Sequence, residues 1–565
     1  MSAYEKISAQ FKQFILADAD ASMALGDESH LGKLGDPSLA HMAQRTQQAQ
    51  ALLEAIQAQG GDTFDERLDL DLMARHLQQD IFFAQLQQHG RPQRCSQPNG
   101  VDGISAGIFQ LFVNDQRRPA LRLDDVLSRL QQAPAYLASE IEVIAEPIAR
   151  WRDIELEQGQ GLPDLLHTIL AWAQQQDYPQ LPALKAATSR CNEAIARYLA
   201  QLQDKKTHQH FAIGLDKVNE LLAIRQIPHS PAQLMHMARS FMAETQTLLS
   251  ALTRKLCQKY QLPASTSESE LHEYLNQRFA ATLTDGTLTS VLDYYYQQVD
   301  DIKQFVDAQQ LFTVPAAQDM KIMQTPSFLE PVIPAGAMWP PLALRAGKKT
   351  SLVYLTLKED QLAEHTELGI PVMMIHEGIP GHHLQFASAA QHPSFIRRIF
   401  SANEHAEGWT TMLEDYMLDV GYIAAERVDE VRFIAKREMS RLVARVGIDL
   451  YFMTQDKAFL EVGLNLDFPS DDVFVNAAKL LQAATGFTDG RVQAELNWYS
   501  TEQSYPLSYL TGNRMVWQLK EDLQAANKKG LNPRQLDRAF HDVYLTSGCM
   551  PVESLRSVFV QLGYL

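Results

Sequence analysis

Stretches with an apolar residue every three or four positions recur along most of this 565-residue chain. They are rich in Gln, Ala, Leu and Glu, which favour the helical conformation, and their spacing matches one face of a helix. Ser230 followed by Pro231 fits a helix start, because Ser can cap the first turn and Pro suits it. We therefore expect a mainly α-helical protein, with helices over the stretches 52–59, 121–148, 235–261 and 428–460.

One region departs from this helical pattern. Between about 313 and 350, Pro and Gly are too frequent for a helix, so we expect an ordered loop. Residues 351–357 follow with the sequence SLVYLTL, whose alternation is typical of a short strand. The length of the chain allows more than one domain, but no repeat or flexible linker marks a boundary.

Composition excludes several classes of function. With 68 acidic and 50 basic residues the formal net charge is -18, which disfavours nucleic acid and anionic membranes as partners. The four cysteines are far apart and form no CxxC pair, which fits a reducing compartment. No signal-like start and no apolar run of about 18 residues is found, so we expect a cytoplasmic location. P-loop, dinucleotide-binding and GxSxG motifs are also missing.

The segment PVMMIHEGIPGHHLQ has the composition of a metal site, with His376, Glu377, His382 and His383 within eight residues. In the HExxH pattern, two histidines at i and i+4 share one helix face and the Glu lies beside the water on the metal. Here the fourth residue after His376 is Pro380, so an unbroken helix cannot present two ligands to one ion.

Pro380 and the following Gly permit a bulge in that helix. Omitting two residues reduces the motif to His-Glu-Gly-Gly-His, which favours His382 as the second ligand and Glu377 as the general base. We expect His383 to point away from the metal, as a group that supports a ligand or faces substrate.

A third ligand is expected from the next helical stretch, NEHAEGWTTMLEDYM. Glu407 and Glu414 are two turns apart on one helix face, so one can bind metal while the other orients a ligand imidazole. The remaining candidates in this stretch are Glu404, His405 and Asp415.

These motifs resemble the bacterial domain-of-unknown-function family 885, whose signature looks like HExxPGHxxQ followed by EGWAxYxE. The counterparts here are HEGIPGHHLQ (376–385) and EGWTTMLE (407–414), and the resemblance extends over essentially the whole chain. That family is similar to gluzincin metallopeptidases of the thimet oligopeptidase and carboxypeptidase Taq type. The resemblance implies a zincin-like helical fold with a deep cleft and a small antiparallel sheet beside the zinc helix, and it makes Glu407 the third ligand.

By the same resemblance, strand 351–357 would be a sheet edge on which an extended peptide lies, with Tyr354 among the groups near substrate. The chain would comprise an N-terminal helical half, 1–215, and a zincin-like catalytic half, 216–565, or one continuous domain. The implied activity is that of a zinc metallopeptidase of carboxypeptidase or oligopeptidase type. It would use one Zn2+ ion to hydrolyse short peptides.

A tyrosine is a suitable donor to the oxyanion that forms during such hydrolysis, because it stays protonated at neutral pH. Tyr499, Tyr505 and Tyr509 crowd one segment, and the resemblance of SYLTG to the family's SYxxG selects Tyr509. The chain departs from the family at Thr410 and Met412, where Ala and Tyr are usual, and at 445–449 and 503–505. Two alternatives therefore stay open: a catalytically silent metal- or peptide-binding protein of the same fold, and a purely structural helical scaffold.

Overall fold

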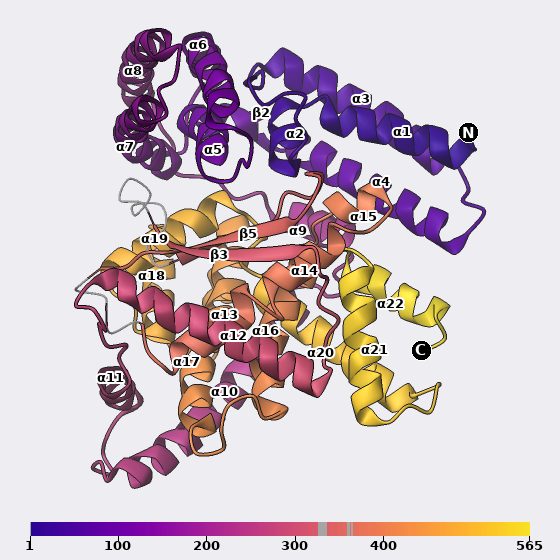
Figure 1. Cartoon of the computed structure of the whole chain (residues 1–565), viewed down its shortest axis with the longest axis vertical. Coiled ribbons are helices and arrows are strands. Elements are labelled where there is room, and N and C mark those ends of the chain that lie inside the picture. The colour runs from indigo at the N-terminus through magenta and orange to yellow at the C-terminus, as the bar shows by residue number, and fades with distance from the viewer. Residues whose placement is uncertain (1, 326–335, 359–361, 363–364) are drawn as a thin grey trace. The chain divides into compact units, whose positions relative to one another are not determined.

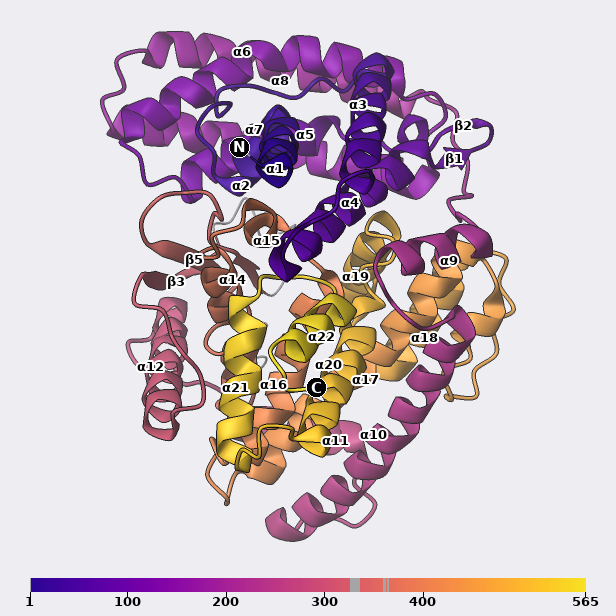
Figure 2. The same cartoon turned by 90° about the vertical axis from the view of Figure 1, so that its right-hand side faces the viewer.

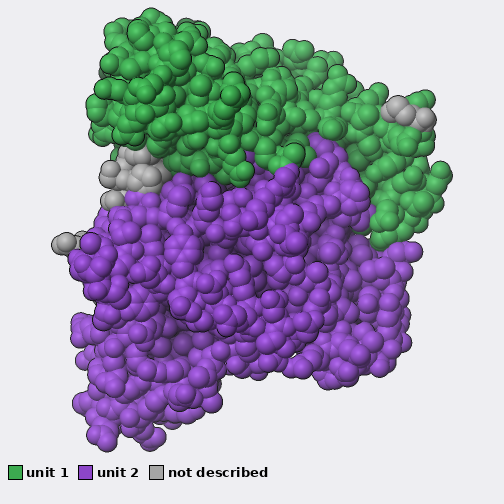
Figure 3. Space-filling view, viewed as in Figure 1, with its two compact units in different colours: residues 1–213, 344–346 green, residues 214–343, 347–565 purple. Residues whose placement is uncertain are grey.

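The computed structural model describes residues 2–325, 336–358, 362 and 365–565. Their secondary structure is mainly helical, as predicted (Figures 1 and 2). Contacts divide the chain into two compact units (Figure 3). Unit 1 comprises Met1–Ile213 with Leu344–Ala346, and unit 2 comprises Gly214–Ala343 with Gly347–Leu565.

Unit 1 consists of helices and one short hairpin. The hairpin pairs β1 (Gln87–Gln88) with β2 (Arg91–Pro92) and leads into a 3-10 turn, η1 (Gln93–Ser96). The helices are α1 (Ala3–Leu16), α2 (Ala19–Leu25), α3 (Leu39–Gln57), α4 (Phe64–Gln85), α5 (Gly100–Val113), α6 (Pro119–Val143), α7 (Ala149–Gln175) and α8 (Leu181–Gln203).

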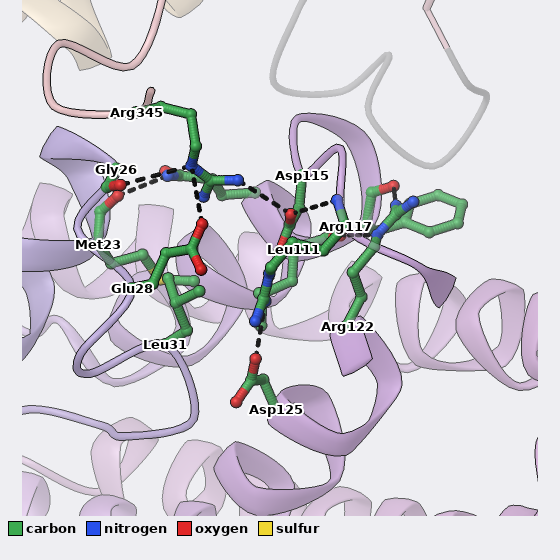
Figure 4. A network of polar contacts seen from close by, with 12 residues as sticks. Met23, Gly26, Glu28, Leu31, Leu111, Asp115, Arg117, Arg122, Asp125 and Arg345 are labelled. Carbon is green, nitrogen blue, oxygen red and sulfur yellow. Dashed lines mark hydrogen bonds and ion pairs between the residues drawn. The ribbon is translucent and has the colours of Figure 1, made fainter. Parts of the chain in front are cut away.

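Three residues from far along the sequence, Leu344–Ala346, belong to unit 1. The predicted division into 1–215 and 216–565 places them in the other half. The Leu344 backbone N–H donates to Leu25 O at 2.8 Å. Arg345 Nη1 lies 3.1 Å from one carboxylate oxygen of Asp115, and Arg117 Nη2 lies 2.5 Å from the other (Figure 4). Burial favours a higher pKa for Asp115, but the hydrogen bonds from the two arginines outweigh it and lower the pKa.

Unit 2 contains the remaining helices and a three-stranded sheet. Its strands are β3 (Gln318–Gln324), β4 (Gly336–Trp339) and β5 (Lys349–Leu355). Its helices are α9 (Leu215–Ile224), α10 (Pro231–Tyr260), α11 (Glu268–Arg278), α12 (Val291–Gln309), α13 (Gly369–Glu377), α14 (His382–Ala389), α15 (Phe395–Ile399), α16 (Asn403–Asp419), α17 (Val428–Thr454), α18 (Val473–Thr485), α19 (Asp489–Thr501), α20 (Ser508–Ala526), α21 (Pro533–Thr546) and α22 (Val552–Gln561), with 3-10 turns η2 (Leu288–Ser290) and η5 (Lys457–Leu460).

The predicted helix start at Ser230 is confirmed. Its side chain accepts from the Gln233 backbone N–H, and the Gln233 side chain accepts from the Ser230 backbone N–H. Two predicted helices are shorter than expected. The stretch 121–148 ends as helix at Val143, and the stretch 428–460 ends at Thr454, because Gln455 adopts a left-handed conformation that stops the helix. None of the described helices is long and apolar enough to cross a lipid bilayer.

The sheet differs from the prediction in three ways. It is mixed rather than antiparallel, because β5 pairs parallel with β3 and antiparallel with β4. The predicted strand is the central one, so it is not a sheet edge, and all its residues are buried. The Pro- and Gly-rich stretch before it contains β3 and β4 as well as loop, while its residues 326–335 lie outside the described part.

Helices α16 and α20 touch through their backbones (Figure 2). A Cβ atom at Gly408 would lie 2.5 Å from the carbonyl carbon and oxygen of Gly512. A Cβ atom at Gly512 would lie 2.2 Å from the carbonyl oxygen of Glu404. Asn513 Nδ2 also donates to Thr411 Oγ1 at 3.2 Å across the contact. Only glycine permits this approach at either position.

We therefore expect Gly408→Ala to destabilise the protein by about 1–3 kcal/mol, because its methyl group would overpack the α16–α20 contact. Urea unfolding monitored by circular dichroism measures the change. Gly490→Ala is the matched control, since a Cβ there meets nothing within 4 Å. Equal stability of the two variants would contradict this account of the contact.

Candidate metal centre

The histidine motif lies on two helices rather than on one bulged helix. Helix α13 ends at Glu377 and α14 begins at His382, so the predicted two-residue bulge is wrong. Gly381 makes the sharp return possible, because a Cβ there would lie 1.9 Å from His376 O. As a result, the rings of His376 and His382 have centroids 5.0 Å apart.

Helix α16 supplies the third group. Among the described residues, His376, His382 and Glu407 are the ones whose possible ligand atoms gather within 4.8 Å of one another. Glu407 Oε2 lies 3.7 Å from His376 Nε2 and 3.4 Å from His382 Nε2. In a tetrahedral zinc site with bonds of about 2.0–2.1 Å, neighbouring ligand atoms are about 3.3 Å apart. The spacing of the three side chains therefore suits zinc.

The two oxygens of the Glu407 carboxylate differ in their hydrogen bonding. Tyr505 donates its hydroxyl to Oε1 at 2.7 Å. Oε2 is buried and has no hydrogen-bond partner among the residues that the structure describes. An unpaired buried carboxylate oxygen is costly, and a cation at this point would remove the cost. The donor set thus fits a metal ion on grounds of chemistry as well as of spacing.

A second carboxylate fixes the orientation of His376. The Nδ1–H of His376 donates to Glu414 Oε1 at 2.7 Å, which leaves Nε2 to face Glu407. This is the arrangement that commonly orients metal-binding histidines. For His382, the corresponding Nδ1 atom lies 3.5 Å from Gln385 Oε1.

The charges of the site shift the pKa values of its members in opposite directions. Burial lowers the pKa of His376, but the hydrogen bond to Glu414 and the charges of Glu377, Glu414 and Glu407 outweigh it and raise the pKa to about 9. Burial raises the pKa of Glu407, but the imidazoles of His382 and His376 and the Tyr505 hydroxyl lower it to about 2. The buried carboxylates therefore attract positive charge, which protons or a metal ion can supply.

The three candidate tyrosines have different surroundings. The Tyr499 hydroxyl accepts from Arg445 Nε at 2.8 Å and donates to Glu495 at 2.5 Å, so it belongs to a buried network. Tyr505 contacts Glu407 directly. The ring of Tyr509 lies 5.9 Å from that of Tyr505. Burial and the charge of Glu407 raise the pKa of Tyr505. Burial and the charge of Glu407 raise the pKa of Tyr509 as well.

Two other predicted residues lie in the sheet region rather than facing the three converging ligand atoms. His383 is fully buried; its Nδ1 accepts from the Ser351 hydroxyl at 2.7 Å, and its Nε2 donates to Gln318 Oε1 at 2.6 Å. It therefore joins α14 to β5 and β3. Tyr354 is 2% exposed and packs edge-on against Trp339, so in this structure it does not present a surface to substrate.

The remaining candidates of the α16 stretch lie outside the group of three. Glu404 forms an ion pair with Arg225, and Asp415 forms one with Lys436 at 2.6 Å. His405 is fully buried, and burial lowers its pKa to about 3.

Two residues that support the site were not predicted. The Trp409 indole donates to Pro380 O at 2.9 Å and so ties α16 to the link between the histidine helices. Asp449, buried in α17, accepts from the backbone N–H groups of Ser504 and Leu507 at 2.9 and 3.0 Å, on either side of Tyr505. Trp409 is part of the sequence motif, so its role near the site could have been predicted. Asp449 contacts residues more than 50 positions away, and no local sequence pattern indicates such a contact.

Comparison with solved structures shows the same fold elsewhere. A putative lipoprotein of unknown function from Shewanella oneidensis has 18% sequence identity and a TM-score of 0.74, covering 99% of this chain and 100% of that one. A putative lipoprotein from Colwellia psychrerythraea has 16% identity and a TM-score of 0.74, covering 99% of each chain. The description as a putative lipoprotein applies to those two proteins. The cytoplasmic location expected for this chain stays a prediction.

Among curated proteins, no sequence matches this chain. The family described as bacterial protein of unknown function (DUF885) matches residues 20–558, nearly the whole length. The match includes both motifs that form the candidate metal centre, and the chain therefore belongs to the DUF885 family.

Proposed function

We propose that this protein is a zinc-dependent metallopeptidase that hydrolyses short peptides, with a zincin-like catalytic unit and a substrate cleft. The observation that carries the proposal is the convergence of His376 Nε2, His382 Nε2 and the unpaired Oε2 of Glu407. Two imidazoles and a carboxylate form a donor set of catalytic zinc sites, in which the fourth position stays open.

When bound there, zinc supplies a Lewis acid that acidifies water and polarises a peptide carbonyl. Glu377, the last residue of α13 and the neighbour of His376, is partly exposed. Its carboxylate can accept a proton from the attacking water and return it to the leaving amine. An intact base beside the ligands favours an enzyme over a silent metal-binding protein, which has no need of it.

Tyr509 is the proposed donor to the oxyanion. The hydroxyl of Tyr499 already lies between Arg445 and Glu495, and that of Tyr505 is held by Glu407. Because the pKa of Tyr509 is raised, its hydroxyl stays protonated and can donate at neutral pH. Tyr505 then has a separate task, to hold the ligand Glu407.

The proposal that the substrate is a peptide rests on the resemblance to gluzincin peptidases and on the sheet near α14. Since β5 has a partner on each side, an extended peptide that pairs with this sheet would use an outer strand, β3 or β4. The net charge of -18 makes nucleic acid an unfavourable substrate.

We expect His376→Ala, His382→Ala and Glu407→Ala to lose most bound zinc on dialysis, as measured by atomic absorption. Glu414→Gln keeps the ligands and weakens zinc binding about 10–100-fold, because the His376 ring loses its orienting partner. His383→Ala is the control: it removes the bonds to Ser351 and Gln318 and lowers stability, but leaves zinc bound. Zinc kept by His382→Ala and lost by His383→Ala would reverse the assignment.

Glu377→Gln should abolish peptide hydrolysis while zinc content stays near that of the original protein, because an amide cannot accept the proton of water. Mass spectrometry of a peptide library, before and after incubation, measures turnover. Unchanged turnover in this variant would rule out Glu377 as the base. Zinc binding without any hydrolysis by the unaltered protein would instead support the silent alternative.

Tyr509→Phe is expected to lower turnover by about 10²–10³-fold with little change in zinc content, the scale of losing one oxyanion donor. Tyr505→Phe should weaken zinc binding first, because it removes the hydrogen bond to Glu407. Paired measurements of kcat and zinc affinity separate the two. If Tyr505→Phe lowers kcat at full zinc occupancy and Tyr509→Phe does not, Tyr505 is the donor.

A further inference from the structure

Two arginines beside the tyrosines have hydrogen-bonding capacity that the fold leaves unused. Arg441 and Arg445 are one turn apart on one face of α17. Arg441 Nε and Arg445 Nη1 are both buried, and neither has a hydrogen-bond partner among the described residues. Buried guanidinium nitrogens nearly always have an acceptor in native proteins, so these two donors can accept a further partner such as a ligand oxygen.

The arginines are connected to the metal centre by a short series of contacts. The Arg445 guanidinium lies over the Tyr509 ring, 4.2 Å from its centroid. The Tyr509 ring lies 5.9 Å from that of Tyr505, which donates to Glu407 at 2.7 Å. Arg445 lies on α17, Tyr509 on α20 and Tyr505 in the segment between α19 and α20, and α17 contacts both α19 and α20. An extended peptide advances about 3.3 Å per residue, so the series spans only a few residues of substrate.

Two carboxylates balance the charge of the two arginines, but neither lies within hydrogen-bond distance of Arg441. Glu495 is shared by both arginines, with its oxygens 3.0 Å from Arg445 Nη2 and 4.0 Å from Arg441 Nη1. Glu438 adds a contact of 3.6 Å to Arg441 Nη1, too long for a hydrogen bond. The Arg441 side chain is 22% exposed and the Arg445 side chain 6%, so a ligand can approach at Arg441 and meet a fixed donor one turn further on.

We propose that Arg441 and Arg445 bind a carboxylate of the peptide substrate, and that this carboxylate is the free C-terminus. The proposal rests on the peptidase function proposed above and makes the enzyme a carboxypeptidase that cuts at a fixed short distance from the C-terminal end. Guanidinium groups are the preferred partners of carboxylates, and a charged hydrogen bond of this kind changes affinity about 10-fold or more.

The test measures binding, so that it does not depend on turnover. Zinc-loaded Glu377→Gln protein is titrated against three fluorescent peptides that differ only at the C-terminal end, and binding is followed by fluorescence anisotropy. The first has a free C-terminus, the second is amidated, and the third is amidated with a C-terminal Glu. We expect the free acid to bind at least about 10-fold more tightly than the amidated peptide without Glu.

Arg441→Gln in the same background should remove most of that preference. Because Arg445 is more deeply buried, Arg445→Lys is the second variant, and it keeps the charge while removing the guanidinium donors. Arg437→Gln is the matched control, one turn away on the same helix and 3.6 Å from Glu268, and it should keep the full preference. Circular dichroism confirms that each variant is folded.

Each outcome decides the proposal. Equal binding of the free acid and the neutral amide, or a preference that survives both Arg441→Gln and Arg445→Lys, would overturn it. Tight binding of the amidated Glu peptide would show that the arginines bind a side-chain carboxylate. This result would overturn the proposal that they bind the C-terminus. Equal binding with hydrolysis by the unaltered protein contradicts this inference alone, whereas a clear preference without hydrolysis contradicts only the proposed function.

Discussion

The direct contact between α16 and α20 is the constraint on which the candidate site depends. Because Gly408 and Gly512 have no side chains, the two helix backbones meet, and the segment before α20 reaches Glu407. Helix α16 carries three residues of the site. Glu407 supplies the carboxylate oxygen that converges with the two imidazoles, Glu414 accepts from His376, and Trp409 donates to the link between α13 and α14. A wider helix spacing would separate the tyrosines from the carboxylate that one of them holds.

Electrostatics explains why these groups suit a cation. Three carboxylates, from Glu377, Glu407 and Glu414, act on two imidazoles in a mostly buried site. A buried acceptor without a hydrogen bond is costly in such a place, and Oε2 of Glu407 has no hydrogen-bond partner among the described residues. A divalent ion would meet this need and would also displace the proton that His376 otherwise holds.

The sequence predicts the helical class, the cap at Ser230 and the pair His376 and His382, because periodicity, capping and motif spacing are local signals. The choice of Glu407 over Glu414 as the third group needed the resemblance to the family. The sequence does not predict the break of the histidine helix, which depends on the contact of Gly381 with His376 O. Nor does it predict the central place of β5, since strand order is set by pairing with distant segments. The support from Asp449 and the place of Leu344–Ala346 in unit 1 are long-range effects of the same kind.

The most direct test of a zinc site at His376, His382 and Glu407 is X-ray absorption at the zinc edge on the purified, zinc-loaded protein. The account predicts one ion per chain with about four ligands at about 2.0–2.1 Å, of which two are imidazole nitrogens and none is sulfur. A first shell that contains sulfur, a shell of six oxygens without imidazole, or less than stoichiometric zinc would contradict it.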